Sequence, residues 1–165
     1  MNEIKVNLEN LTETEREQIL ALIDKANEPK AWKPKEAEKY FFINFIGDIE
    51  AVNWCACSFD EKLYSLGNCF KTQKEAELTV EYLKVRANLK RFADEHNEEP
   101  IDWNNREQKK YMIRYSYLKN HFSISSYKDI RHAGAIYFTS EKIAQQAVTT
   151  IGEEILIKYY FWVGE

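Results

Sequence analysis

Two segments of this chain follow one pattern, and that pattern restricts the folds open to it. They read "GNCFKTQKEAELTVEYL", Gly67 to Leu83, and "GAIYFTSEKIAQQAVTTI", Gly134 to Ile151. In each, an aromatic residue stands two positions before a Thr or Ser of the kind that caps helices, and a run with an early Ala follows. A shift of 68 positions aligns Phe138 with Phe70. We therefore expect an internal repeat.

A predicted hairpin precedes each capped helix. "KYFFINFIGDIEAVNWCACSF" is rich in aromatic and β-branched residues and is broken at Gly47-Asp48, which predicts two antiparallel strands. "DEKLYSLGN" is expected to add a short strand. "KKYMIRYSYLKNHFSISSY" alternates and turns at Lys119-Asn120, which predicts a second hairpin. Its alternation places Tyr111 and Ile113 on one face, and Lys110 and Arg114 on the other, solvated face.

A helix is predicted before the repeats. Thr12 and Glu15 form a capping box, apolar residues then recur at helical spacing to Ala26, and Pro29 ends the pattern. The expected fold is α+β, with two related ββ(β)α units with antiparallel sheets and an N-terminal helix that covers one side. The expected divisions are an N-terminal helical segment (1–30), a first ββ(β)α unit (31–100) and a second one (101–165). The tail, Glu153 to Val163, fits a helix or a strand equally well.

The long helix expected from Gln73 to Phe92 carries two apolar stripes. Ala76, Val80, Leu83 and Ala87 share one face, and Leu78, Tyr82, Val85, Leu89 and Phe92 lie nearly opposite. Two stripes imply a helix covered on both sides, or a helix covered on one side whose other side is kept for a partner. We favour the first, with the N-terminal helix or the second repeat as the cover. The polar connector "DEHNEEPIDWNNREQ" follows, with Trp103 as its expected anchor in the core.

The charge distribution and the cysteine content indicate in which compartment the chain works. The net charge is -4, and the acidic excess lies within Met1 to Pro100, whereas Asn104 to Lys142 is basic. Three cysteines form an odd, sparse set that suits a reducing compartment, and Cys55 and Cys57 are interpreted as small buried residues on a strand. With no signal peptide or membrane span expected, we expect the chain to stay in the cytoplasm where it is made.

No catalytic or metal constellation is predicted. A zinc site is expected to need a more widely spaced Cys pair with convergent His or Cys, and the three histidines are scattered. The chain also lacks a Gly-rich phosphate loop and the H-E-x-x-H and G-x-S-x-G motifs. We therefore expect a protein that is not an enzyme and that uses no metal and no cofactor.

Several short stretches resemble one group of proteins. "WKPKEAEKYFFI", "GNCFKTQKEAE", "LKRFA", "IDWNN", "YFTSE" and "IGEEILIKYYF" are similar to small, uncharacterised proteins encoded by phages and prophages of Gram-positive bacteria. The similarity runs from Trp32 to Phe161, with "GNCFKT" and "LKRFA" as its most specific parts, and Asp48 to Leu63 departs most. The resemblance implies a viral accessory protein in a bacterial host and carries no site residue with it.

The favoured functional hypothesis is binding to a host protein, with inhibition of a defence nuclease or another nucleic-acid-processing protein in the manner of an anti-CRISPR protein. The acidic connector and the second helix stripe, if exposed, would form the interface. The candidate partner-binding residues are Leu78, Tyr82, Val85, Leu89, Phe92, Asp94, Glu95, Glu98 and Glu99.

The alternative hypothesis is a module that binds single-stranded nucleic acid through the second hairpin. Cations neutralise phosphates and aromatic faces stack on bases in such modules. The candidate residues are Lys109, Lys110, Arg114, Lys119, Lys128, Arg131, Tyr115, Phe122 and Tyr127. The opposing interpretation is that these aromatics are core and the cations an ordinary solvated face.

Overall fold

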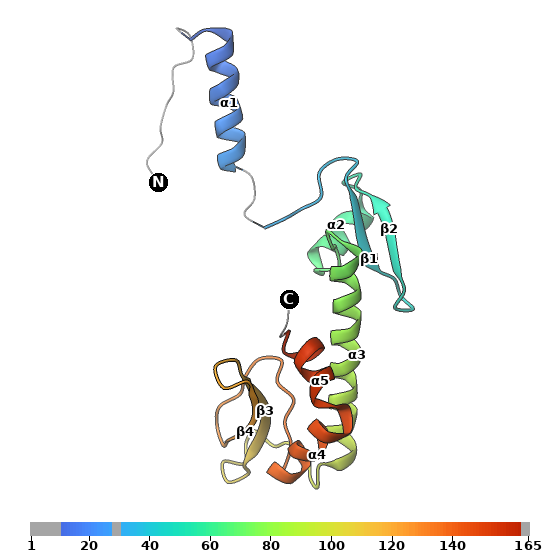
Figure 1. Ribbon diagram of the computed structural model, residues 1–165, viewed down its shortest axis with the longest axis vertical. Helices are drawn as coiled ribbons and strands as arrows, with labels where there is room; N and C mark the ends of the chain where they lie inside the picture. The colour runs from blue at the N-terminus through green and yellow to red at the C-terminus, as the bar shows by residue number, and fades with distance from the viewer. Residues whose placement is uncertain (1–10, 28–30, 163–165) are drawn as a thin grey trace. The chain divides into compact units, whose positions relative to one another are not determined.

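The structure, a computed structural model, describes residues 11–27 and 31–162 and contains both helices and strands, as expected for the α+β class (Figure 1). In chain order the elements are α1 (Glu13–Asn27), β1 (Lys39–Ile43), β2 (Ile49–Asn53), α2 (Ser58–Ser65), α3 (Gln73–His96), β3 (Lys110–Ser116), β4 (His121–Tyr127), α4 (Glu141–Ile151), α5 (Glu153–Ile155) and the π-helix η1 (Leu156–Tyr160). The strands form two separate two-stranded sheets, β1-β2 and β3-β4.

The chain forms two compact units. The small unit is Met1–Lys39 with Asn53–Cys69, and the large unit is Tyr40–Val52 with Phe70–Glu165. These units cut across the expected divisions at residues 30 and 100, because α3 from the first repeat packs against α4 from the second. The division into 31–100 and 101–165 therefore stays a prediction about the repeat in the sequence.

Each repeat joins its capped helix to its own hairpin in the same way. Phe70 exchanges two backbone hydrogen bonds with Phe41 of β1, with N–O distances of 2.8 and 2.9 Å. Phe138 exchanges the same pair with Tyr111 of β3, again at 2.8 and 2.9 Å. The two aromatics that the sequence aligns are thus the points at which the chain pairs with the first strand of each hairpin before it enters a helix.

The predicted caps are present at all three helix starts. The hydroxyl oxygens of Thr72 and Ser140 each accept the backbone N–H three residues on, at 3.2 Å. Thr12 and Glu15 bond each other reciprocally. The Glu15 carboxylate accepts the Thr12 N–H at 2.9 Å, and the Thr12 hydroxyl oxygen accepts the Glu15 N–H. Each cap satisfies N–H groups that have no partner inside the helix.

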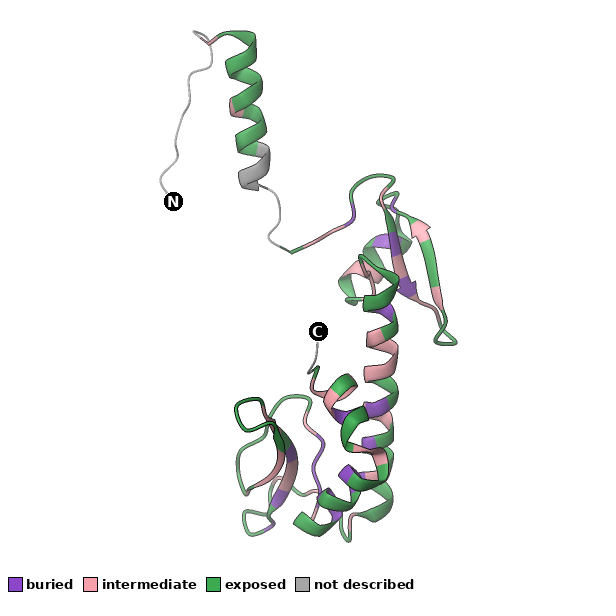
Figure 2. Cartoon of the chain, in the orientation of Figure 1, coloured by how far each residue is buried: buried purple, intermediate pink, exposed green. Residues whose placement is uncertain are grey.

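The core of the large unit is built from one face of α4 and the facing sides of α3, η1 and the β3-β4 hairpin (Figure 2). Two small residues, Ala144 and Ala147, are fully buried and let helix and sheet approach closely. In the hairpin, Ile113 of β3 lies opposite Ile124 of β4. The other buried members are Val85, Leu89, Ala93, Ile136, Phe138, Ile143, Val148 and Leu156.

The two stripes of α3 differ in role. The stripe proposed for a partner is the one that packs into the core: Val85 and Leu89 are 4% and 1% exposed. On the opposite stripe, Ala76 is fully buried and Leu83 is 50% exposed. The second repeat covers the second stripe through α4 and η1, as the favoured alternative expects, so the condition under which that stripe would form an interface is not met.

The segment expected to form a third strand is a helix instead. α2 spans Ser58–Ser65, with Asp60 and Glu61 in its first turn, where carboxylates interact favourably with the helix dipole. It ends in a Schellman motif, in which Gly67 N–H bonds Tyr64 O at 3.0 Å and Asn68 N–H bonds Leu63 O at 2.8 Å. Gly67 has φ +70°, which a glycine adopts without steric cost. These local signals outweigh the short apolar run.

The tail is helical from Glu153 to Tyr160, and Val163 lies outside the described residues. Gly152, at φ +99°, ends α4, and the chain continues as α5 and η1 before the aromatic residue Phe161. The N-terminal helix forms as expected, but its apolar side chains Leu20, Leu22 and Ile23 are exposed. The expectation that this helix covers one side of the fold stays a prediction.

The cysteines are not the buried residues that the sequence suggested. Cys55 and Cys57 are exposed and Cys69 is half-buried, because β2 ends before the first of them. Hydrogen bonding with the side chains of Cys57 and Asp60 raises the pKa of the Cys55 thiol to about 11. Burial, followed by the charges of Asp60 and Glu61, raises the pKa of Cys69 to about 11.

Candidate partner-binding cleft

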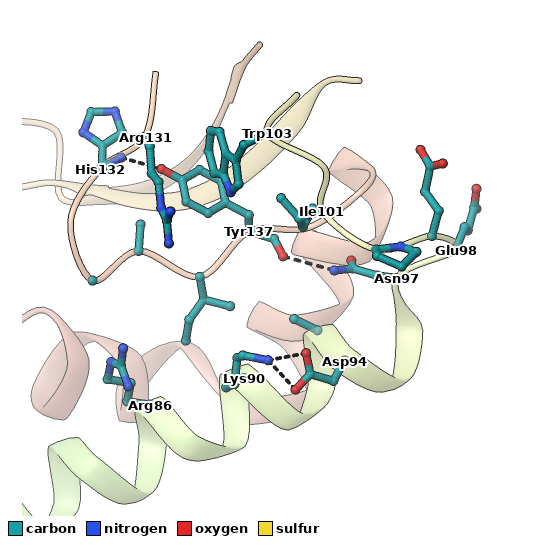
Figure 3. Close-up of a pocket in the computed structure, with 16 residues that line it drawn as sticks. Arg86, Lys90, Asp94, Asn97, Glu98, Ile101, Trp103, Arg131, His132 and Tyr137 are labelled. Carbon is teal, nitrogen blue, oxygen red and sulfur yellow. Dashed lines mark hydrogen bonds and ion pairs between the residues drawn. The ribbon is translucent and has the colours of Figure 1, made fainter. Parts of the chain in front are cut away.

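A cleft of about 670 Å³ lies in the large unit, between the C-terminal half of α3, the segment 97–103 and the segment 131–137 (Figure 3). α3 contributes Arg86, Lys90, Ala93 and Asp94 to one wall. The helix presents these residues together because they are three or four positions apart, or adjacent at the wall's end.

Asn97 fixes the segment that leaves α3. Its side-chain amide donates to Tyr137 O at 3.1 Å and its oxygen accepts the Thr139 N–H at 2.9 Å. The next residue, Glu98, donates its N–H to the Thr139 hydroxyl at 3.2 Å. The end of α3 is thus tied to the strand-like segment that leads into α4, so both walls of the cleft are held in register.

Gln108 holds in place the part of the connector from Glu99 to Asp102. Its side-chain nitrogen donates to Glu99 Oε1 and to Pro100 O, both at 2.9 Å, and its oxygen accepts the Asp102 N–H at 2.8 Å. Because Gln108 is 7% exposed, these bonds are shielded from water and cross-brace the loop.

Trp103 forms an aromatic wall of the cleft with Tyr137. The two rings meet edge to face at 4.9 Å, and the Tyr137 hydroxyl accepts the His132 N–H at 2.6 Å. The Arg131 guanidinium lies 5.5 Å from the Trp103 ring and the Lys110 ammonium 5.4 Å from it, both within the range of cation–π attraction. Trp103 is half-buried, lines the cleft and is not part of the core cluster, so the prediction that it anchors the connector in the core is not borne out.

Lys110 is buried rather than solvated. Its side chain is fully enclosed, and its ammonium donates to the carbonyl oxygens of Asn105, Gln108 and Lys128 at 2.8, 2.9 and 3.2 Å. All three of its donors are used in holding the connector. The interpretation of Lys110 as a solvated cation available to phosphate is therefore wrong.

The cleft carries charges of both signs. Figure 3 shows Arg86 on α3 and Arg131 on the facing loop at one end, and Glu98 at the other end. Lys90 and Asp94 pair with each other on the α3 wall between these ends. Apolar groups, among them Ile101 and Ile136, complete the lining. The lining is therefore bipolar.

The structure separates the predicted partner-binding residues. Val85 and Leu89 are core, and Leu78, Tyr82 and Phe92 are half-buried, with Tyr82 stacked on Tyr160 at 5.9 Å. Asp94, Glu98 and Glu99 line the cleft. Glu95 is exposed and lines a shallower depression with Phe92.

The predicted nucleic-acid residues are dispersed as well. Tyr115 and Phe122 each pack against Phe161, at 5.8 Å between ring centroids, so they support the core interpretation. Lys128 pairs with Glu107 at 2.9 Å, and that pairing lowers the pKa of Glu107. Tyr127 packs edge-on against His132 at 4.8 Å, and Arg131 reaches the cleft. The exposed remainder is Lys109, Arg114 and Lys119.

The cleft joins residues that belong to rival hypotheses. Arg131 is a member of the nucleic-acid set, and Asp94, Glu98 and Glu99 are members of the partner set. The lining residues Arg86, Lys90, Asn97, His132 and Tyr137 are in neither predicted set. Their shared signal in the sequence is weak, because contacts between residues distant in the chain, such as the packing of α3 on α4, bring α3 and the facing loops together.

No protein-family model, curated protein or solved structure matches this chain. Among the helices of residues 11–27 and 31–162, none has both the length and the apolar character that a membrane span needs.

Proposed function

We propose that this chain is a non-catalytic binding protein and that an extended segment of a protein partner docks in the cleft. In this proposal it acts in the cytoplasm of a bacterial host, as a phage accessory protein that inhibits a defence protein or another nucleic-acid-processing protein. The resemblance to phage and prophage proteins supports the setting. The bipolar lining of the cleft is the observation that supports binding.

The charge distribution favours a protein over a nucleic acid as the occupant. A nucleic-acid backbone carries a negative charge at every phosphate and is met by a continuous basic surface. Here Asp94, Glu98 and Glu99 would repel it. Fewer of the basic candidates on the hairpin are available to phosphates, because Lys110 is buried and Lys128 is paired with Glu107.

The lining describes the segment that would fit. An acidic side chain of the partner would lie at the end of the cleft that holds Arg86 and Arg131. An apolar side chain would contact apolar lining residues such as Ile136, and a basic one would approach Glu98. Complementary charges of this kind set specificity and orientation more than raw affinity.

Affinity capture with paired variants tests the proposal. We expect wild-type protein to retain a specific host protein from a lysate of a Gram-positive bacterium, and Arg86→Glu to weaken its recovery by at least about tenfold through charge repulsion. Lys142→Glu is the matched control, because Lys142 is exposed on α4 and does not line the cleft. The measurement is quantitative mass spectrometry, followed by calorimetry with the purified partner.

Equal recovery by Arg86→Glu and wild type would contradict the cleft as the docking site. Failure to capture any reproducible partner would contradict the proposed function as a whole.

A salt titration of single-stranded oligonucleotide binding tests the alternative. We expect that Arg114→Glu removes no binding at low salt, because Lys110, on the same face of β3, is buried and Lys128 is paired with Glu107. Binding with a steep salt dependence that this substitution removes would replace the proposed function with the nucleic-acid hypothesis.

A further inference from the structure

Three metal-ligating side chains converge in the small unit, and none of them lines the cleft. One ligand atom each from Cys55, Cys57 and Asp60 lies within 4.8 Å of the other two. Two thiol sulfurs and a carboxylate oxygen at such spacing can move into the first coordination shell of one ion by side-chain rotation. Cysteine and histidine spacing does not reveal this set in the sequence, because a carboxylate completes it.

The local backbone brings the three groups together. Ala56, between the two cysteines, has φ +54°, so the chain bends there instead of continuing as a strand. Cys57 then becomes the N-cap of α2, which places Asp60 in the first turn. Asp60 Oδ2 accepts the Cys55 N–H at 2.7 Å, which closes the loop on itself.

Contacts on both sides hold the loop that carries Cys55 and Cys57 in place. Trp54, immediately before it, exchanges backbone hydrogen bonds of 2.9 Å with Ala37 and Glu38 and meets the Tyr64 ring of α2 edge to face at 6.2 Å. Lys33 lies 5.1 Å from the Trp54 ring and 5.0 Å from the Tyr64 ring. Ordering the three ligands therefore costs little additional conformational entropy.

The small unit also has few buried apolar residues. Among its described residues, only Pro34, Trp54 and Asp60 are buried, and Asp60, at 2% exposed, is a carboxylate. Folding units of this size commonly depend on a disulfide or a structural metal because apolar burial is insufficient. A buried carboxylate carries a desolvation cost even when it is hydrogen-bonded, and a bound cation would offset that cost.

We propose that Cys55, Cys57 and Asp60 bind one zinc ion, with water as the fourth ligand. The ion would link the segment that follows β2 to the first turn of α2. Thiolates select against Mg²⁺ and Ca²⁺, which prefer oxygen ligands, while the carboxylate suits a borderline ion such as Zn²⁺. Binding breaks two S–H bonds and forms two Zn–S bonds, and the two protons pass to solvent without any change in oxidation state.

Cobalt substitution in the full-length, reduced protein tests the site. We expect Co²⁺ to produce thiolate-to-cobalt charge-transfer absorption and the visible bands of tetrahedral cobalt, saturating at one ion per chain. Zn²⁺ is expected to displace Co²⁺, to raise the midpoint of thermal unfolding and to protect two thiols from alkylation. Calorimetry in buffers of different ionisation enthalpy is expected to report about two protons released per ion.

Single substitutions assign the ligands. Cys55→Ser or Cys57→Ser is expected to weaken zinc affinity by more than the roughly 100-fold that outer-shell partners carry. Asp60→Asn keeps an acceptor for the Cys55 N–H but loses the charge, and is expected to weaken zinc without removing the thiolate bands. Cys69→Ser is the matched control and is expected to bind as wild type does. Circular dichroism checks that each variant is folded.

Three results would each overturn the zinc site. The first is the absence of thiolate–cobalt bands in the folded, reduced protein. The second is unchanged zinc affinity in folded Cys57→Ser. The third is a Cys55–Cys57 disulfide that persists in reducing buffer. None of these results bears on the cleft, so this inference and the proposed function fail independently.

Discussion

Among single residues, Lys110 shows how a side chain can leave the role that its strand pattern assigns. Strand alternation places it with Arg114, on the face of β3 opposite Ile113. Arg114 is exposed, whereas Lys110 is enclosed by the connector around Asn105 and Gln108. The alternation of the strand is therefore observed. However, the connector that encloses Lys110 lies outside the strand, and nothing in the sequence of the strand predicts it.

Replacing Lys110 is expected to destabilise the protein although no apolar contact is lost. Lys110→Met removes three charge-assisted donors and leaves three carbonyl groups without them, which we expect to cost about 2–4 kcal/mol. The free energy of unfolding, from urea denaturation followed by tryptophan fluorescence, measures the loss.

The control is Lys109→Met, at the exposed neighbouring position. It is expected to change stability by no more than about 0.5 kcal/mol. Equal effects of the two substitutions would show that the bonds made by the Lys110 ammonium carry no stability.

Among the secondary-structure elements, η1 completes the core by covering α3. Tyr160 stacks on Tyr82 of α3 with the two rings 16° from parallel, and Leu156 is fully buried. The aromatic run of the tail fits a strand by propensity, but Gly152 stops α4 and the chain then returns along α3 as a helix. Packing against α3 therefore selects between the two possibilities that the sequence leaves open.

The contact of η1 with α3 predicts a pH dependence. Burial, and then the neighbouring Tyr82, raises the pKa of Tyr160 above its usual value. A pKa that is higher in the folded state contributes stability that is fully present below the unfolded pKa, about 10, and is lost as the pH rises through the folded value. We therefore expect stability to fall less steeply with pH above about 10 in Tyr160→Phe than in wild type.

Urea denaturation at a series of alkaline pH values measures this slope. Leu83→Ala, at a half-exposed position of α3, removes no ionisable group and is the control, which is expected to keep the wild-type slope. A wild-type slope in Tyr160→Phe would contradict the assignment of this loss of stability to the titration of Tyr160.

In the molecule as a whole, the repeats do not fold as separate bodies. α3 belongs to the first repeat, yet its residues Val85, Leu89 and Ala93 lie in the same core as Ala144 and Ala147 of the second. This sharing explains why α3 is much longer than α4, with 24 residues against 11. It also places the C-terminal half of α3 beside the segment 131–137, which creates the cleft.

Paired truncations on α3 test which stripe is core. Leu89→Ala is expected to cost about 2–5 kcal/mol, because it leaves a cavity in the shared core. Leu83→Ala, the same change on the opposite stripe, is expected to cost no more than about 1 kcal/mol because Leu83 is half exposed. Chemical denaturation measures both, and a larger loss for Leu83→Ala would contradict the assignment of the stripes.

Elements with local signals could be predicted from the order of the amino acids alone. Thr12, Thr72 and Ser140 cap helices through bonds to residues three positions away, and the two hairpins follow from strand propensity and turns.

Long-range packing instead established which stripe of α3 is covered, that Lys110 is buried, and that Arg86 faces Arg131 across a cleft. These features depend on contacts between residues distant in the chain. The free energy of such contacts leaves no periodic pattern in either partner's own segment, so no inspection of one segment at a time could reveal them.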